Sequence, residues 1–346
     1  MSFEKLFSEH LNKHSSIESV DVIKLCYQAA FGAEHLISNT VAAEELLKEE
    51  FKNTNAMKMD LFEKISEDVC RINISAWKYE KLPISWLFKM FVASANVENN
   101  SQEKFFEYLG CVKRILINEK PSLRFEEYLV EYFAEGIRAV HHSDGYRENE
   151  HPSYRLVRTE FLRLVPILKN ALKHIKNDKI CVIAIDGRAA SGKTTLAKLL
   201  ETVLDADIIH MDDFFLPPNL RSSERLDTAG GNIHYERFLE EVIPYISINS
   251  DFSYRIFDCS KMDYNGTKTV GNKRFRIVEG SYSCHPLFKE YADITVFSNV
   301  DADEQMKRIV KRNGKEMAVI FRDKWIPFEE RYFETYNIMK NCNIIL

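Results

Sequence analysis

The stretch that decides the fold is IDGRAASGKTTLAKLL, residues 185–200, in the second half of a chain of 346 residues. An apolar run, KICVIAID (179–186), precedes it, and apolar residues at helical spacing follow it. Residues 187–194 fit the pattern G-x-x-x-x-G-K-[ST], which requires a strand before it and a helix after it. The sequence therefore predicts a phosphate-binding loop between a strand and a helix.

This loop has the residue types that hold a nucleoside triphosphate. Glycines let backbone N–H groups turn toward phosphate oxygens, and the positive end of the following helix adds to the attraction. We expect Lys193 to reach the terminal phosphates and Thr194 to offer its hydroxyl to Mg²⁺. ATP and Mg²⁺ are thus the expected cofactors. The predicted nucleotide contacts are Gly187, Arg188, Ala189, Ala190, Ser191, Gly192, Lys193, Thr194 and Thr195.

Carboxylates stand at two further strand ends. Asp212 and Asp213 follow the strand-like run ADIIHM (206–211), and Glu279 ends the run RFRIVEG (274–280) before a glycine. Phosphoryl transfer needs a metal bridge and a group that orients the acceptor oxygen, and carboxylates can supply both. Ligands of open α/β sheets bind beyond the carboxyl ends of the strands. We therefore expect all three acids to face the phosphate-binding loop.

Together these motifs resemble the uridine kinase and phosphoribulokinase group of P-loop kinases. The resemblance lies in GRAASGKTT, MDDFF, FDCSKMD, IVEG and a late basic stretch, and it covers residues 179–340 and none of the first half. It implies that Asp212 is the base that takes the proton of the acceptor hydroxyl. It places Glu279 near the metal, so that the implied metal ligands are Thr194, Asp212 and Glu279. It also implies that Phe215 and Asp258 belong to the acceptor site.

A basic stretch near the end of the chain, MKRIVKRNGKEMAVIFRDKW (306–325), resembles the lid of the same family. Arg308 and Arg312 are four residues apart and therefore share one helix face. Arginines in that position can stabilise charge on the transferred phosphoryl group, which makes them predicted catalytic residues with Lys193 and Asp212. Arg322 is a further candidate. The alternative interpretation is a solvated helix of mixed charge.

The residues that recognise the nucleoside in this family are not matched in the present sequence. Uridine kinases usually carry an aspartate in an N-[FW]-D-H-P stretch, and here GGNIHYERF (230–238) has His234 in its place. Met262 stands near the position of a histidine that the family uses on the base. The phosphate half of the site thus matches the resemblance, whereas the acceptor half differs.

Three functions stay open for this reason. The acceptor can be a nucleoside, or another small alcohol such as a sugar or a vitamin precursor. In the third alternative, the domain is a nucleotide-gated switch and the helical half binds a partner. Arg221 lies on an inserted loop, where it could hold a carboxylate or phosphate of the acceptor. Arg225 and Lys261 are similar candidates.

The first half of the chain has a different pattern. Residues 1–175 are predicted to form an all-helical domain of unknown role, and residues 176–346 an α/β P-loop kinase domain with a parallel sheet flanked by helices. Besides the three strand-like runs named above, the sheet is expected to include FSYRIFD (252–258) and ADITVFS (292–298). The boundary is expected in HIKNDK (174–179). Predicted helical runs include LFEKISEDVCRI (61–72) and LVRTEFLRLVPILKNALKHI (156–175).

Four side chains of the polar run HHSDGYRENEH could bind a metal, but their spacing fits no common ligand pattern. This run is therefore interpreted as a loop. The four residues are His141, His142, Asp144 and His151.

Composition excludes some classes of partner. The net charge of −5 argues against nucleic-acid binding, and the seven cysteines include no CxxC pair and so predict reduced thiols inside a cell. No apolar run has the length of a membrane span, and the start of the chain lacks the apolar stretch of a signal peptide. We expect a cytoplasmic enzyme that acts on a small-molecule acceptor, without nucleic-acid or membrane partners. The sequence leaves the oligomeric state open.

Overall fold

The computed structural model describes residues 2–33, 37, 39–96, 102–175 and 179–346. It divides into two compact units, Met1–Leu162 and Arg163–Leu346. The division precedes the predicted boundary because helix α9 (Val165–Ala171) packs against strand β9 of the C-terminal sheet. Part of the predicted boundary, residues 176–178, lies outside the described residues.

The C-terminal unit is built on a parallel sheet whose strand order is β10-β9-β4-β8-β5. Every residue of β4 and β8 is buried, as is usual for parallel strands covered on both faces. The predicted strands within 180–186, 206–211, 274–280 and 292–298 are confirmed. The bounds are Cys181–Gly187 for β4, Ala206–His210 for β5, Phe275–Glu279 for β8, Ile294–Ser298 for β9 and Ile344–Ile345 for β10.

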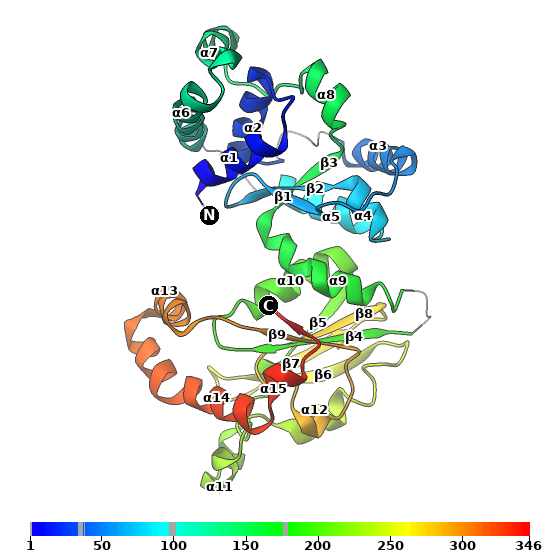
Figure 1. The fold of residues 1–346 in the computed structure, drawn as a ribbon. Helices are drawn as coiled ribbons and strands as arrows, with labels where there is room; N and C mark the ends of the chain where they lie inside the picture. Colours follow the sequence, from blue (N-terminus) through cyan, green and yellow to red (C-terminus); the bar gives the residue numbers. More distant parts are fainter. Residues whose placement is uncertain (1, 34–36, 38, 97–101, 176–178) are drawn as a thin grey trace. The chain divides into compact units, whose positions relative to one another are not determined.

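Helices cover both faces of this sheet (Figure 1). Helix α10 (Lys193–Leu204) contacts β4, β5 and β8 on the face where α9 also lies. Helices α12 (Tyr235–Glu241) and α14 (Ile326–Thr335) cover the other face, where Phe238 and Phe333 join one apolar core with strand residues. The predicted parallel sheet with flanking helices is therefore confirmed. The remaining helices of this unit are α11 (Ser223–Asp227), α13 (Ala302–Ile320) and α15 (Ile338–Asn341).

One predicted strand lies outside the parallel sheet. Strand β6 (Phe252–Asp258) pairs antiparallel with β7 (Asp263–Val270) in a two-stranded sheet of its own. The sequence DYNGTKTV of β7 is mostly polar and exposed, so it has no apolar periodicity that would indicate a strand. The prediction that β6 joins the parallel sheet is therefore wrong. It arose because the partner strand, β7, has no apolar pattern from which a second sheet could be predicted.

The N-terminal unit has helix α2 (Ser19–Phe31) near its centre, in contact with α6, α7 and β2. Its buried face includes Val22, Cys26 and Ala29. No helix in the described part of the chain has both the length and the apolar character needed to cross a membrane. The other helices are α1 (Phe3–Lys13), α3 (Thr40–Asn53), α4 (Ile74–Tyr79), α5 (Ile84–Ala95), α6 (Gln102–Glu119), α7 (Phe125–Ala134) and α8 (Asp144–Glu150).

This unit is not all-helical, because it contains a three-stranded antiparallel sheet of order β1-β2-β3. Residues 61–72 were predicted as a helix since Phe62, Ile65 and Val69 repeat at helical spacing. A turn interrupts them instead, in which Ser66 Oγ accepts a hydrogen bond of 3.1 Å from the Val69 amide. The strands are β1 (Phe62–Lys64), β2 (Val69–Asn73) and β3 (Tyr154–Arg158), and β3 also replaces the start of the helix predicted over 156–175.

The polar run interpreted as a loop contains helix α8. Ser143 caps this helix, and its hydroxyl accepts a hydrogen bond of 3.0 Å from the Tyr146 amide. His142 is separately engaged: Nδ1 lies 2.7 Å from Asp21 Oδ1, and Nε2 lies 2.8 Å from the Tyr154 hydroxyl. His141 and His151 are exposed, so the described structure does not gather the histidines of this run into a metal site.

His142 is expected to remain neutral well below the usual pKa of histidine. Its side chain is 8% exposed, and burial lowers its pKa to about 4. In the unfolded chain a histidine is protonated near pH 6.5. Between pH 6.5 and 4 the unfolded state therefore binds more protons than the folded state. As a result the free energy of unfolding falls as pH falls, by at most about 3 kcal/mol. An NMR titration of the histidine rings, assigned with His142→Gln, measures this directly. Titration of His142 near pH 6.5 would contradict the prediction.

Candidate active site

The phosphate-binding loop leaves β4 at Gly187 and enters α10 at Lys193. Gly187 has φ of 137°, and it pairs with Ser298 of β9 so closely that a Cβ here would lie 2.0 Å from the Ser298 carbonyl oxygen. Gly192 caps the helix with φ of 92°. Both glycines of the motif thus occupy backbone conformations that side chains disfavour.

Asp186 anchors the loop from the interior of the unit. It is completely buried, and Oδ1 accepts hydrogen bonds from the amides of Gly187 (2.7 Å) and Tyr282 (3.1 Å). Oδ2 accepts from the amide of Cys284 and the hydroxyl of Tyr332, both at 2.9 Å. Burial raises the pKa of Asp186 although these donors oppose the change. This carboxyl ties the loop to the segment after β8, a role that the sequence prediction missed.

Glu279, at the end of β8, lies beside the first residues of α10. The Thr194 hydroxyl is 3.2 Å from both carboxylate oxygens of Glu279. Strand pairing sets His210 of β5 opposite Glu279, and His210 Nδ1 lies 2.6 Å from Oε1. Lys193 Nζ donates to the carbonyls of Gly187 (2.7 Å) and Arg188 (2.9 Å). The structure therefore brings the loop and a strand-end carboxylate together, as expected.

Asp212 lies in a short turn (Met211–Phe214) after β5, and its side chain lines a cavity shared with Lys193 and Glu279. The cavity opens to solvent. The pKa of Asp212 is nevertheless raised, first because surrounding protein removes water from the carboxyl and second because Glu279 carries a like charge. Asp213 differs, because its Oδ2 accepts a hydrogen bond of 2.8 Å from Tyr254. The expectation that three acids face the loop is thus wrong for Asp213.

The cavity has a volume of about 870 Å³. Gly187 and Ser191 are buried beneath it, and the Arg188 side chain forms bonds of 2.6 and 2.9 Å to Glu330 instead. These three residues can therefore act on a nucleotide through their backbone only. The predicted residues that line the cavity are Ala189, Ala190, Gly192, Lys193, Thr194, Thr195, Asp212, Phe215, Arg221, Glu279, Arg308 and Arg312.

Helix α13 supplies most of the positive charge of the cavity through Arg308, Lys311 and Arg312. Arg308 Nη1 lies 3.3 Å from the Ala190 carbonyl, so its guanidinium reaches the loop itself. Gly314, with φ of 82°, interrupts the helical backbone after these residues. With Lys193, the helix surrounds the loop with cations, which is the field that a polyphosphate requires.

Four predicted candidates lie elsewhere. Asp258 accepts hydrogen bonds from the amide (2.8 Å) and hydroxyl (2.6 Å) of Ser260 within its own turn. Arg225 forms an ion pair of 2.6 Å with Glu236. Their side chains make local contacts and do not line the cavity, so the assignment of Asp258 to the acceptor site stays a prediction. Besides Gly187, Arg188 and Ser191, the predicted candidates that do not line the cavity are Asp258, Arg225, Lys261 and Arg322.

Other side chains of the cavity were not predicted. Glu329 of α14 accepts a hydrogen bond of 2.8 Å from the Ala189 amide and one of 2.7 Å from the Ser281 hydroxyl. Burial raises the pKa of Glu329. Phe321 and Trp325, which begin and end a π-helical turn after α13, add aromatic surface. Phe321 and Trp325 lie within the lid-like stretch 306–325, but its arginines alone were singled out, whereas Glu329 lies outside it and had no local signal.

Comparison with known proteins finds no matching family model and no matching curated protein. Similar solved structures include the following two. A possible uridine kinase from Bacillus stearothermophilus has a TM-score of 0.41 and 20% identity, covering 54% of this chain and 100% of that one. A putative fructose transport system kinase from Silicibacter sp. TM1040 has a TM-score of 0.44 and 19% identity, covering 53% and 98%. Both leave the N-terminal region unmatched.

Proposed function

We propose that the C-terminal unit is a kinase that transfers the γ-phosphoryl group of ATP to a hydroxyl of a small molecule. One observation carries the proposal: the phosphate-binding loop with Lys193 shares a single cavity with two strand-end carboxylates, Asp212 and Glu279. A loop of this kind binds phosphates, and a carboxylate within the same cavity can orient and deprotonate an acceptor hydroxyl. The motif resemblance to P-loop kinases supports the same conclusion.

The residues of the cavity divide the work between donor and acceptor. Loop amides and Lys193 bind the triphosphate, and Arg308 and Arg312 stabilise negative charge on the phosphoryl oxygens as transfer proceeds. Asp212 accepts the proton of the acceptor hydroxyl, and its raised pKa makes the carboxylate a stronger base than an ordinary aspartate. Phe321 and Trp325 line the same cavity and give it apolar surface near the loop.

The donor set beside the loop fits Mg²⁺. Thr194 Oγ1 lies 3.2 Å from both oxygens of Glu279, and Asp212 lines the same cavity, so that a hydroxyl and two carboxylates are available. Such hard oxygen ligands are those that Mg²⁺ prefers. Mg²⁺, when bound, neutralises charge on the β- and γ-phosphates. In this assignment Thr194, Asp212 and Glu279 hold the ion.

The acceptor side of the cavity is mixed in character. Phe215, Cys259 and Met262 contribute apolar surface, and Asn232 and Arg221 contribute polar groups. An alcohol with a polar or anionic substituent fits this combination, because arginine pairs with carboxylate and phosphate groups. The proposed acceptors are therefore nucleosides and related small alcohols, with sugars and vitamin precursors as the alternative within the same chemistry.

A coupled assay of ADP release tests the proposal. With ATP and Mg²⁺, the full chain is expected to release ADP only when a suitable alcohol is added, and a panel of nucleosides, sugars and pantothenate-like alcohols identifies the class. Turnover with a sugar but not with uridine or cytidine would exclude the nucleoside version. If no acceptor raises ADP release above the rate with ATP alone, the kinase proposal fails and the nucleotide-gated switch becomes the better account.

A further inference from the structure

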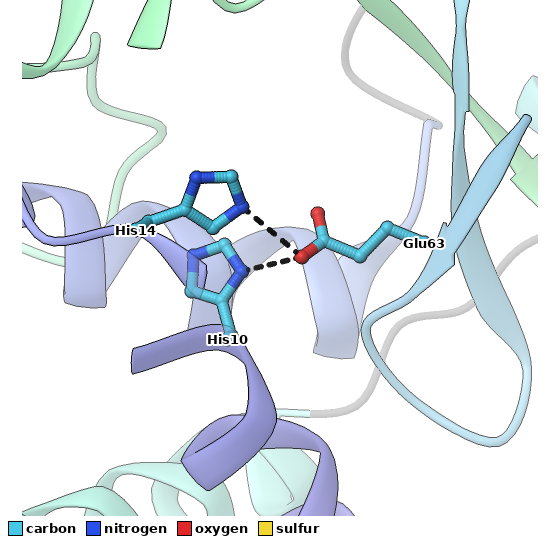
Figure 2. Close-up of side chains that lie close together, drawn as sticks. All are labelled: His10, His14 and Glu63. Atoms are coloured by element: carbon cyan, nitrogen blue, oxygen red, sulfur yellow. Dashed lines mark hydrogen bonds and ion pairs between the residues drawn. The ribbon is translucent and has the colours of Figure 1, made fainter. Parts of the chain in front are cut away.

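Three side chains of the N-terminal unit, His10, His14 and Glu63, converge on one carboxylate oxygen (Figure 2). His10 lies in the last turn of α1, His14 is the residue that ends this helix, and Glu63 lies in β1. His10 Nδ1 is 2.7 Å and His14 Nε2 is 3.3 Å from the same oxygen, Glu63 Oε1. Their ligand atoms all lie within 4.8 Å of one another.

Surrounding groups hold two of these side chains in place. His14 Nδ1 lies 3.0 Å from Glu150 Oε2, and the other oxygen of Glu150 accepts a hydrogen bond of 3.3 Å from the Ser16 amide. A carboxylate on the far nitrogen of an imidazole fixes its tautomer and directs the near nitrogen toward a metal. Here that near nitrogen is His14 Nε2, which faces Glu63 (Figure 2).

The second oxygen of Glu63 is held by a buried arginine. Arg71 Nη1 lies 3.4 Å from Glu63 Oε2, and Gln28 anchors the same guanidinium with bonds of 3.2 and 2.7 Å. Arg71 and Gln28 are 3% and 4% exposed, so this support is part of the core. As a result, Oε1 is the carboxylate oxygen left to face the two imidazoles.

We propose that His10 Nδ1, His14 Nε2 and Glu63 Oε1 bind one divalent ion of the zinc type. Two imidazoles and one carboxylate are a recognised zinc ligand set that leaves the fourth position to water. Tetrahedral ligands of zinc lie roughly 3.4 Å apart, which is close to the His14–Glu63 separation of 3.3 Å. The His10–Glu63 pair, at 2.7 Å, needs only to open slightly.

The competing account is a histidine–carboxylate cluster held by protons alone. Burial lowers the pKa of His10 to about 4, which leaves a neutral ring. For His14, burial acts downward, but the bonds to Glu63 and Glu150 outweigh it and raise the pKa. In that account the His14 ring is protonated on both nitrogens and donates from Nε2 to Glu63 and from Nδ1 to Glu150. A metal ion would have to displace the proton on Nε2. The two accounts differ in whether zinc binds here at all.

Zinc titration of the metal-depleted full chain decides between them. By calorimetry near neutral pH, the wild-type chain is expected to bind one more Zn²⁺ tightly than either His10→Gln or His14→Gln. His141→Gln is the matched control, because it removes an exposed histidine of the same unit and should leave binding unchanged. Equal zinc stoichiometry and affinity in wild type and His14→Gln would overturn the proposal.

A fourth variant keeps the test decisive if a ligand variant fails to fold. Glu150→Gln leaves all three ligands in place and removes only the carboxylate behind His14, which should weaken Zn²⁺ binding about 10- to 100-fold. Thermal melting with and without Zn²⁺ confirms that this variant is folded. Wild-type affinity in Glu150→Gln would show that the bound Zn²⁺ lies elsewhere, and no tight Zn²⁺ in the wild-type chain would show that the cluster is held by protons; either result would overturn the proposal. None of these measurements depends on kinase activity.

Discussion

Replacing Asp212 with asparagine is expected to reduce acceptor-dependent turnover by about 100- to 10,000-fold while ATP still binds. The amide of asparagine has the shape of the carboxylate but cannot take the proton of the acceptor hydroxyl. Most of the nucleotide affinity should persist, because the loop, Lys193 and two of the three proposed Mg²⁺ ligands, Thr194 and Glu279, remain unchanged in the cavity. Steady-state ADP release gives the turnover, and calorimetry with ATP gives the affinity.

The neighbouring residue offers a matched control. Asp213 has the same chemistry one position along, but its carboxylate accepts a hydrogen bond from Tyr254 and does not line the cavity. An asparagine at 213 can still accept this bond through its side-chain oxygen, so Asp213→Asn should retain most of the turnover. Equal losses in the two variants, or no loss in Asp212→Asn, would remove Asp212 from the mechanism.

Gly187→Ala is expected to destabilise the C-terminal unit by about 4 kcal/mol or more, beyond the range of ordinary substitutions. The added Cβ would meet the carbonyl oxygen of Ser298 at 2.0 Å and its amide nitrogen at 2.7 Å. Both atoms belong to the backbone of β9, which pairs with β4 at this position and cannot move without breaking the sheet. Calorimetric melting measures the loss, and the transition that ATP and Mg²⁺ raise identifies the C-terminal unit.

Gly266→Ala separates steric from conformational cost in the same unit. Gly266 also has a positive φ of 88°, but a Cβ there would meet no atom within 4 Å. The expected loss is therefore only the conformational cost of about 1–2 kcal/mol. If Gly187→Ala lost no more than Gly266→Ala, the close packing of the loop against β9 would be disproved.

The loop and strand ends of the C-terminal unit were predictable because their signals are local. The motif at 187–194 lies between a recognisable strand and helix, and acids that end parallel strands must meet at one edge of the sheet. This logic places Asp212 and Glu279 correctly. It fails for Asp213, because both acids lie in a short turn after β5, and there the Asp213 carboxylate accepts a hydrogen bond from Tyr254 instead. Asp258 was assigned from the family resemblance alone, and its strand pairs outside the parallel sheet.

The remaining features depend on contacts between distant parts of the chain. Glu329 meets the loop across 140 residues, and no local pattern announces such a contact. The strands β1 and β2 were mistaken for a helix because a turn at Ser66 separates apolar residues that happen to repeat at helical spacing. His10 and Glu63 are 53 residues apart, so their meeting follows only once that helix is replaced by strands.

The account depends most on phosphoryl transfer to an alcohol, and ³¹P NMR observes this step directly. The full chain is incubated with ATP, Mg²⁺ and the alcohol that gives the highest ADP release. The account predicts that the γ-phosphate signal of ATP is replaced by an equal signal of a phosphate monoester, together with ADP. Conversion of the γ-phosphate to inorganic phosphate alone, or an unchanged ATP spectrum with every acceptor, would contradict it.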